Sequence, residues 1–351
     1  MTKMASLLRG LSYRFNTPTP STDFKKAKNE DALFPKTDPA VDGGDCLHDC
    51  ESCSIKYPRK FEIDQDDKLY GNIGGWNTHL IVATGKTDWV RDVADEKGSV
   101  MEAVSKAEEP TNGKMMLSAS NMPIPHSSHS DPDGQVRTTV LLLPAFKFID
   151  NVTPAAVPDL IQHCVNNAPT NTSPLADPAS DNSLTSTPLP AGLDMRDCPH
   201  NYLILLCSHA TRDARCGQSA PLLKKELERQ LRPLGLARDF DDERPGGVGI
   251  YFINHVGGHK YSANVLVYRR RLSPDGKPLS EAAQCIWLAR IKPSDCENLV
   301  RYTVLQGKVV KPGEQLRGGF DRSTQLTNFA PEKGAHPETL VSLKMYTTNA
   351  P

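Results

Sequence analysis

The stretch "NYLILLCSHATRDARCGQSAPLLKKELERQLRPLGL", residues 201–236, decides the fold that we expect for this chain. Its first seven residues, Asn201–Cys207, form an apolar run that is typical of a buried strand. Leucines recur every three or four positions along Ala220–Leu236, and Pro221 stands where a helix tolerates proline, so an amphipathic helix is predicted there. A buried strand followed by such a helix is typical of an α/β domain.

Three more predicted strands and a helix follow. The strands are GVGIYFINH (247–255), KYSANVLVYRR (260–270) and QCIWLARI (284–291). Ser294 and Glu297 have capping-box spacing and predict the start of the helix. The order strand, helix, strand, strand, strand, helix indicates a compact α/β domain with one mixed sheet. Thioredoxin-like folds have this order, and so do many other small α/β folds.

The N-terminal half has a weaker pattern. Thr78–Gly85 and Arg137–Asp150 are predicted strands, and the segments 89–109 and 158–168 are predicted helical regions. Residues 166–196 are rich in Pro, Ser, Thr and Asn and have no sustained period. We therefore expect a disordered or targeting segment (1–45), an N-terminal α/β domain (46–165), a disordered linker or insertion (166–196), a second α/β domain (197–310) and a C-terminal extension (311–351).

Charge and hydropathy narrow the classes of partner and location. The formal net charge is -1, which gives no general attraction to nucleic acid or to an anionic membrane. No apolar run approaches the roughly 18 residues of a membrane span. The N-terminus carries Lys3, Arg9 and Arg14 and no acid before Asp23. This pattern is typical of a mitochondrial transit peptide, and the alternative is a basic tail on a cytosolic protein.

Two cysteines and two histidines are predicted to converge at one edge of the C-terminal sheet. The chain has 9 cysteines and no secretory h-region, which favours metal or redox use over a disulfide framework. Cys207 ends the first strand and Cys216 follows it, whereas His255 and His259 follow the next strand around a Gly-Gly pair. Neighbouring parallel strands end at the same edge of a sheet, so all four side chains are expected there.

This donor set has more than one reading. Two thiolates and two imidazoles suit tetrahedral zinc, and they also suit a [2Fe–2S] cluster in which two histidines replace two cysteines. The C-x8-C gap is long for a zinc finger or ribbon, but spacing alone does not decide. A third reading is two buried structural cysteines and two surface histidines.

The two motifs together resemble the sucrase/ferredoxin-like family. They are CSHATRDARCG (207–217) and HVGGHKYSANV (255–265), and the resemblance covers at least residues 200–305. It extends more weakly to THLIVATGKTDWVRDV (78–93). It implies a C-terminal thioredoxin-like ferredoxin domain with a mixed sheet flanked by helices. A smaller, degenerate thioredoxin-like α/β domain would precede it.

The resemblance also implies a cofactor and its ligands. In that family the C-x8-C and H-x-G-G-H motifs bind a [2Fe–2S] cluster, so the ligands here would be Cys207, Cys216, His255 and His259. By analogy with Rieske centres, the cysteines would bind one iron and the histidines the other. The chain departs from plant and bacterial thioredoxin-like ferredoxins, which have two cysteines in the second region. Histidine ligation would raise the reduction potential and couple it to pH.

The implied function is proton-coupled electron transfer by a non-enzymatic carrier that serves a redox protein partner, either a reductase or an acceptor. A zinc-stabilised interaction module is one alternative. Another is a thiol–disulfide oxidoreductase that uses Cys50 and Cys53, which have the C-x2-C spacing.

Several residues near the four predicted ligands have two alternative interpretations each. His209 is either a competing ligand or a solvent-facing loop residue. Arg212 and Asp213 either hydrogen-bond cluster sulfurs or form an ion pair that holds the loop, and the ion pair is favoured. Lys260 and Asn264 either contact the ligands or are exposed, and exposure is favoured.

The other cysteines fall into two groups. Cys46, Cys50 and Cys53, with His48, form a C-x3-C-x2-C cluster that predicts either a second metal site or thiol chemistry, or has no function. Four isolated cysteines are expected to be ordinary packed or semi-exposed thiols: Cys164, Cys198, Cys285 and Cys296.

Overall fold

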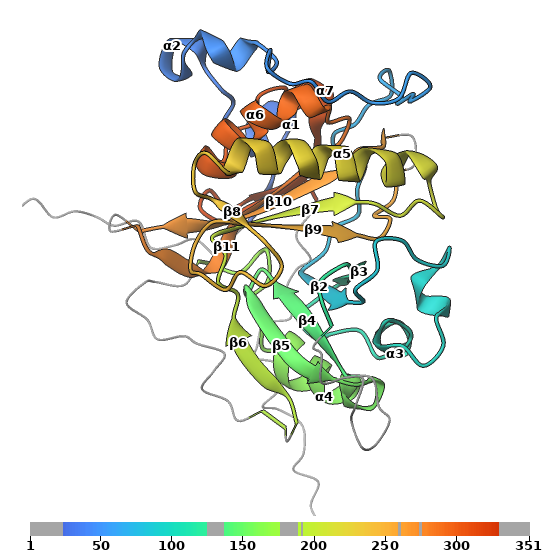
Figure 1. Cartoon of the computed structure of the whole chain (residues 1–351). Coiled ribbons are helices and arrows are strands. Elements are labelled where there is room, and N and C mark those ends of the chain that lie inside the picture. Colours follow the sequence, from blue (N-terminus) through green and yellow to red (C-terminus); the bar gives the residue numbers. More distant parts are fainter. Residues whose placement is uncertain are drawn as a thin grey trace, which may run out of the picture.

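A large mixed sheet organises the chain. The structure is a computed structural model that describes residues 24–124, 137–175, 189–190, 192–258, 261–273 and 276–329. Within these residues 13 strands form one sheet, flanked by helices (Figure 1). The strand order is β1-β13-β12-β11-β10-β7-β9-β3-β2-β4-β5-β6, with β8 paired to β9. The predicted α/β class is confirmed, and the arrangement is consistent with a thioredoxin-like fold.

The C-terminal half follows the predicted element order. Its strands are β7 (Tyr202–Cys207), β8 (Ala237–Arg238), β9 (Val248–Ile253), β10 (Val265–Leu272) and β11 (Pro278–Leu288). β7 pairs parallel with β9 and antiparallel with β10. Every residue of β7 is buried, as expected for a central strand covered on both faces. The two-residue strand β8 is the one addition to the predicted order.

Both helices of this half start differently from the prediction. Helix α5 spans Ala214–Leu231 and begins before the expected Ala220, because the Asp213 side chain accepts a hydrogen bond from the Arg215 amide and caps it. The later helical segment begins at Pro293, where the Lys292 amide donates to Asp295 at 2.8 Å. The predicted capping box of Ser294 and Glu297 is therefore wrong. A 3₁₀ turn (Pro293–Asp295), α6 (Cys296–Asn298) and a π-helix (Leu299–Val304) make up this segment.

The N-terminal half supplies a second set of strands. They are β2 (Thr78–Ala83), β3 (Met115–Ser120), β4 (Thr138–Leu143), β5 (Lys147–Val152) and β6 (Asp194–Asp197). Residues 137–150, predicted as one strand, instead form the β4–β5 hairpin, because the chain reverses at Pro144–Phe146. The first predicted helical region contains a 3₁₀ turn (Val93–Asp95) and α3 (Val100–Lys106). The second begins earlier than predicted, with a 3₁₀ turn (Pro154–Ala156) before α4 (Val157–Asp159) and a π-helix (Leu160–Val165).

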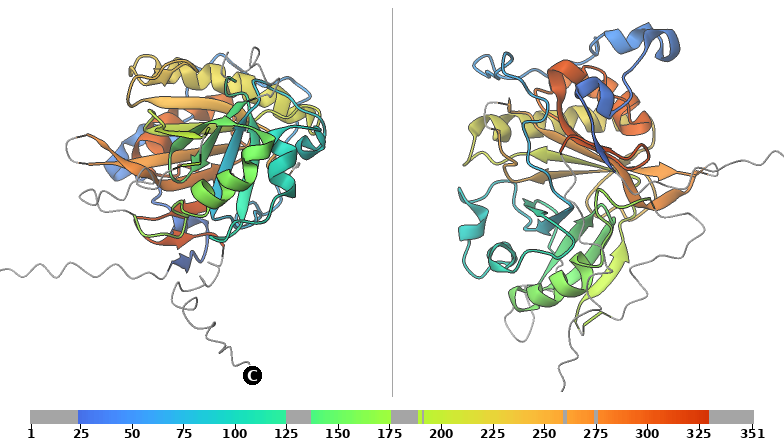
Figure 2. Two further views of the ribbon diagram at one scale, coloured as in Figure 1. Left: turned by 90° about the horizontal axis from the view of Figure 1, so that it is seen from below. Right: turned by 180° about the vertical axis from the view of Figure 1, so that it is seen from behind.

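The two halves of the sheet pack face to face. One core lies between α5 and the sheet and includes Leu223, Ile204 and Val265. A second core joins the other face of β7 to the N-terminal strands through Leu205 and Ile81. A third lies between the N-terminal strands and helices α3 and α4. Figures 1 and 2 show the result, in which α5 and α6 cover one outer side and α3 and α4 the other.

A few hydrogen bonds join the halves along the sheet itself. Ser120 of β3 pairs antiparallel with Ile253 of β9. Asn121 accepts from the Phe252 amide at 2.7 Å, and the Asn254 side chain accepts from the Ala119 amide at 3.0 Å. The end of β9 is therefore fixed to the N-terminal half directly before His255.

Both ends of the described chain belong to the folded structure. Residues 24–45 lie in the segment predicted as disordered or targeting, and for them that prediction is wrong, because Leu33 and Phe34 are buried in the core. This region contains β1 (Lys25–Lys26), α1 (Glu30–Leu33), α2 (Pro39–Asp42) and a 3₁₀ turn (Gly44–Leu47). The region predicted as an extension adds α7 (Pro312–Gln315), β12 (Leu316–Asp321) and β13 (Leu326–Thr327). Residues 1–23, the rest of the segment predicted as disordered or targeting, lie outside the described residues. The domain boundaries stay predictions.

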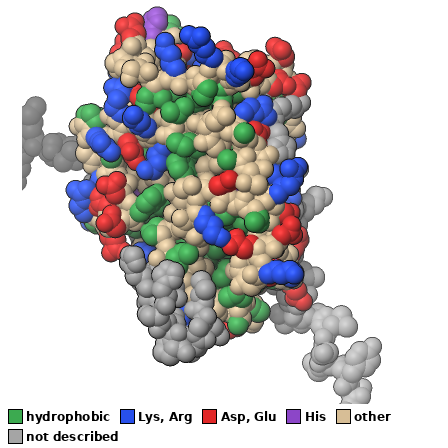
Figure 3. Space-filling model, turned by 45° about the vertical axis from the view of Figure 1, so that its right-hand side comes forward, with side chains coloured by type: hydrophobic (Ala, Val, Ile, Leu, Met, Phe, Trp, Pro, Cys, Tyr) green, Lys and Arg blue, Asp and Glu red, His purple; other side chains and the backbone are tan. Residues whose placement is uncertain are grey.

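The surface agrees with the near-zero net charge. Figure 3 shows basic and acidic side chains interspersed over the face that it presents. None of the helices in the described ranges combines the length with the apolar composition that crossing a membrane requires.

Buried His79 predicts acid sensitivity of the fold. Its ring contacts Tyr268 Oη at 3.0 Å and Ser118 Oγ at 2.9 Å, and burial lowers its pKa to about 3. An unfolded histidine has a pKa of about 6.5, so below that pH the unfolded chain binds the proton first. Stability is complete above about pH 6.5 and falls toward pH 3, by about 2 kcal/mol at pH 5. His79→Gln keeps hydrogen-bonding capacity without titrating and should lose about 2 kcal/mol less between pH 7 and pH 5.

Urea unfolding at the two pH values measures this difference. His48→Gln is the control, because His48 is exposed and its loss should leave the wild-type acid response unchanged. Equal acid responses in wild type and His79→Gln would show that His79 does not carry the effect.

Candidate metal centre

Three of the four predicted ligands meet at the carboxyl edge of β7 and β9. In the parallel register Cys207 is opposite Ile253, and His255 follows two residues later. Cys216 lies in the first turn of α5. The Nδ1 atom of His255 lies 3.7 Å from the Cys207 Sγ and 3.9 Å from the Cys216 Sγ, and the three ligand atoms lie within 4.8 Å of one another. The fourth predicted ligand, His259, lies outside the described residues.

The pKa values of the two buried thiols are shifted in opposite directions. A hydrogen bond from the Cys216 thiol holds the pKa of Cys207 below its usual range, and His255 and the Val256 amide add to this against the effect of burial. The same hydrogen bond and burial raise the pKa of Cys216. Cys216 also lies at the N-terminus of an 18-residue helix, whose dipole favours negative charge. A cation would bind both sulfurs as thiolates, so binding would release any proton that they hold.

The donor set fits a metal centre. Bonds of about 2.3 Å to sulfur and 2.0 Å to nitrogen at a tetrahedral ion place the two ligand atoms about 3.5 Å apart. The measured 3.7 and 3.9 Å agree with that spacing for one ion, or for ligands of the same iron in a cluster. Ligands on opposite irons would be farther apart, so the assignment of His255 to the iron opposite the cysteines stays a prediction.

The glycine pair after His255 has a steric reason. Gly257 and Gly258 have φ angles of 83° and 71°, in the left-handed region that side chains disfavour. A Cβ atom on Gly258 would lie 2.6 Å from Nη2 of Arg317. Glycine therefore lets the backbone turn tightly and approach a buried guanidinium.

His209 is a buried support for His255. The prediction that it faces solvent is wrong, because only 1% of its surface is exposed. Its Nδ1 accepts a hydrogen bond from the His255 amide at 3.3 Å, which leaves the proton on Nε2 to donate to the Trp89 carbonyl at 3.0 Å. His209 is not in the group of potential ligands, and it fixes the backbone of one that is.

Residues 87–91 of the N-terminal half clamp the loop between the two cysteines. Ser208 donates to the Thr87 carbonyl at 2.7 Å, and the Thr211 hydroxyl donates to Asp88 at 2.7 Å. Burial raises the pKa of Asp88, but its hydrogen bonds from Thr211 outweigh burial and hold it below the usual range. The ligand loop is thus fixed by a segment about 120 residues earlier in the chain.

The favoured ion pair of Arg212 and Asp213 is not formed. Arg212 donates to the Arg91 carbonyl at 3.1 Å, as part of the clamp. Asp213 instead pairs with Arg215 at 2.9 Å while it caps α5. The two arginines of the motif, Arg212 and Arg215, therefore have separate structural roles.

Asn264 is buried, so the expectation that it is exposed is also wrong. Its side-chain oxygen accepts from Trp287 Nε1 at 3.1 Å and from Arg317 Nη1 at 2.7 Å. Its amide nitrogen donates to the Tyr261 carbonyl at 2.9 Å. Lys260, the other predicted neighbour, lies outside the described residues.

The second cysteine cluster does not form a metal group among the described residues. Cys46 and Cys50 are buried and Cys53 is half-buried, whereas the potential metal group contains only Cys207, Cys216 and His255. Cys50 accepts hydrogen bonds from Arg229 and Gln230, both at 3.6 Å. Cys164, Cys198, Cys285 and Cys296 are buried free thiols, as predicted for packed cysteines.

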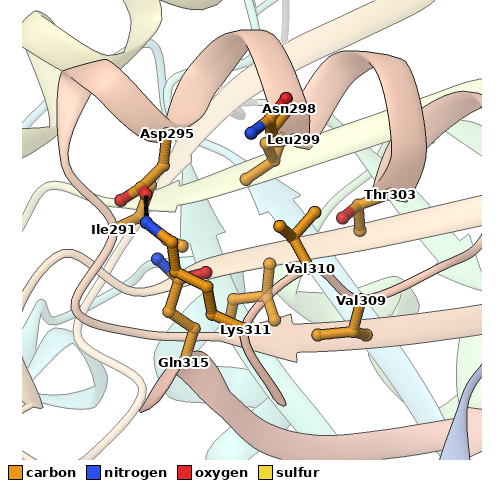
Figure 4. Close-up of a pocket in the computed structure, with 10 residues that line it drawn as sticks. Ile291, Asp295, Asn298, Leu299, Thr303, Val309, Val310, Lys311 and Gln315 are labelled. Carbon is orange, nitrogen blue, oxygen red and sulfur yellow. Dashed lines mark hydrogen bonds and ion pairs between the residues drawn. The ribbon is translucent and has the colours of Figure 1, made fainter. Parts of the chain in front are cut away.

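The pocket in Figure 4 is separate from the metal centre. Aliphatic side chains such as Leu299 and Val310 line it, and Lys311 reaches across to pair with Asp295 at 2.8 Å. The ten described residues around it include no cysteine or histidine, so it offers no soft ligands.

The comparisons with known proteins agree with the site. A family model described as sucrase/ferredoxin-like matches residues 69–318. The chain belongs to the sucrase/ferredoxin-like family.

Several fungal proteins are similar to this chain, two of them over most of its length. Actin patches distal protein 1 of Saccharomyces cerevisiae is 26% identical over 79% of this chain and 85% of its own length. Altered inheritance of mitochondria protein 32 of Clavispora lusitaniae is 26% identical over 80% of this chain and 93% of its own. The protein of that name from Debaryomyces hansenii is 34% identical over 33% of this chain and 35% of its own. No solved structure gives a significant match.

Two supports of the site were not foreseen from the sequence. The clamp at residues 87–91 falls in the stretch that resembles the family, but nothing there indicates contact with the cysteine loop. Arg317 lies in the predicted extension, and no local pattern connects it with the motifs.

The hydrogen bond from the His255 amide to His209 predicts a role in metal binding. Groups that support a metal ligand typically contribute tenfold to a hundredfold in metal affinity. His209→Ala should therefore weaken the affinity of the centre for zinc by roughly tenfold or more, because His255 loses its anchor. Competition with a chromogenic chelator measures the change.

His200→Ala is the matched control for the loss of a buried imidazole. His200 contacts Tyr251 at 3.1 Å, and its loss should lower stability without changing zinc affinity. A zinc affinity that is the same in His209→Ala and wild type would refute the anchoring role.

Proposed function

We propose that the protein is an electron carrier with one [2Fe–2S] cluster held by Cys207, Cys216, His255 and His259. The observation that carries the proposal is the convergence of two sulfurs and an imidazole nitrogen, within 4.8 Å, in a chain of the sucrase/ferredoxin-like family. The cluster would supply one-electron redox chemistry.

The surrounding residues support such a centre in three ways. Burial of Cys207 and Cys216 keeps water from the thiolates. The N-terminus of α5 stabilises the negative charge of the ligands. The clamp and His209 hold the cysteine loop and the His255 backbone in place, so the ligands need little rearrangement when the charge changes.

The histidine side of the centre is its solvent side. His255 is half-buried and Gly257 is exposed, whereas both cysteines are buried. A redox protein partner, either a reductase or an acceptor, would therefore approach the loop at His255. Histidine ligation would make electron transfer depend on pH.

A zinc-stabilised module is the second candidate. The distances of 3.7 and 3.9 Å from His255 Nδ1 to the sulfurs suit ligands of a single tetrahedral ion, which favours this reading over scattered thiols. Zinc would join the carboxyl edge of the sheet to α5 and have no redox role.

The relatives' names bear on the location. Several are named altered inheritance of mitochondria proteins. Together with the basic, acid-poor N-terminus, this supports a mitochondrial location, with the cytosol as the alternative.

Metal analysis after anaerobic purification separates the two candidates. The cluster predicts about two irons and two acid-labile sulfides per chain, visible colour and an EPR signal after reduction. Cys216→Ser, His255→Ala and His259→Ala should each remove most of the iron and the colour. One zinc per chain without colour or signal would refute the cluster and support the zinc module.

Two variants control for cysteine and histidine loss elsewhere. Cys53→Ser and His48→Ala remove residues of the second cluster, and both should retain wild-type iron and sulfide. Loss of iron in these variants would show that the iron is bound at the N-terminal cysteine cluster.

A further inference from the structure

Arg317 is buried close to the candidate centre. It lies in β12 and is 2% exposed. Its Nη1 donates to the Gly257 carbonyl at 3.1 Å and to Asn264 at 2.7 Å, and its Nη2 donates to the Asn72 carbonyl at 3.0 Å. Gly257 belongs to the turn that follows His255, so this guanidinium is bonded directly to the histidine loop.

The described groups that accept hydrogen bonds from this cation are neutral. The guanidinium carbon lies 5.0 Å from the ring centre of Trp287 and 5.4 Å from that of Tyr261, close enough for cation–π attraction. Among the described residues no carboxylate lies within ion-pair distance of Arg317, and its buried Nε makes no hydrogen bond. A buried charge without an opposite charge is costly, so something else must compensate it.

A ligand of the proposed centre, Cys207, is one source of negative charge that acts on Arg317. Burial lowers the pKa of Arg317 to about 10, and the charges of Tyr261 and Cys207 oppose that decrease. The side chain is therefore a cation at neutral pH, and its charge interacts with one of the ligand thiolates. Interactions between charges are stronger in a buried site than in water, because the effective dielectric constant is lower.

We propose that Arg317 is the counter-charge of the metal centre and raises its reduction potential. This rests on the proposed [2Fe–2S] function. Two ferric ions, two sulfides, two thiolates and two neutral imidazoles have no net charge, so one-electron reduction adds a single negative charge. A fixed cation nearby stabilises the reduced form more than the oxidised form. Arg317 also positions the histidine loop through the Gly257 carbonyl.

Arg290 provides a matched comparison. It is 5% exposed, and its guanidinium carbon lies 5.4 Å from the ring centre of Tyr261, as in Arg317. Unlike Arg317, Arg290 has an opposite charge beside it, because its Nη2 lies 3.7 Å from the Asp64 carboxylate. Loss of Arg290 therefore removes a buried guanidinium whose charge is already balanced.

Redox titration of the cluster-loaded protein tests the proposal. Arg317→Met should lower the reduction potential enough to change the ratio of reduced to oxidised centre about tenfold at a fixed applied potential, or about 59 mV. Arg317→Lys keeps the charge and should shift the potential much less. Arg290→Met should leave it close to wild type.

A second variant keeps the test decisive if Arg317→Met does not fold. Asn264→Asp places a carboxylate against the retained guanidinium, so it balances the charge and should also lower the potential. Visible spectra and iron content confirm that each variant holds the same centre.

The outcomes separate this inference from the proposed function. A wild-type protein without iron and sulfide overturns the proposed function. A loaded wild type whose potential matches that of folded Arg317→Met, or of Asn264→Asp, overturns only the role of Arg317. A decrease in Arg317→Met that Arg317→Lys shares in full shows a positioning role without the charge effect, and it also overturns the counter-charge proposal.

Discussion

The parallel pairing of β7 with β9 is the constraint on which the site depends. It places Cys207 opposite Ile253, so that the first sulfur and the histidine loop leave the sheet at the same edge. A shift of one residue in either strand would turn its side chains to the opposite face. Burial of both strands on both faces fixes the register, because any slip would move leucine and isoleucine side chains from the core that they fit into the opposite core. Packing energy in the sheet therefore determines the geometry of the ligands.

The N-terminal half completes this site. On either side of Ile253, Asn254 is bonded to Ala119 of β3 and Phe252 to Asn121, the residue after β3. The clamp at residues 87–91 holds the cysteine loop. The two halves share a continuous core as well as a sheet. A centre held from both sides tolerates less movement than one built on a single loop, and small movement favours fast electron transfer. In physical terms, the N-terminal half acts as a support for the ligand loops.

The sequence allowed prediction of those parts of the fold that depend on local patterns. The apolar run ending at Cys207 and the leucine stripe of α5 correctly identified a strand and a helix, and the two motifs identified three residues that the structure brings together. Helix starts were less predictable, because residue spacing does not show the local geometry by which the side chains of Asp213 and Asp295 cap the helices. His209, Asn264 and Arg317 were missed or misread because their burial arises from contacts with segments far along the chain.

Several features near the centre lower the stability of the metal-free protein. Cys207 and Cys216 are two thiols buried close together with pKa values shifted in opposite directions, and Arg317 has a charge that no described carboxylate balances. Such features persist only where the surrounding structure holds them, and they cluster at functional sites. A bound cation would interact with both sulfurs and join the end of β7 to α5. Metal binding would thereby stabilise the fold at the place where its own packing is least favourable, which links occupancy of the centre to folding.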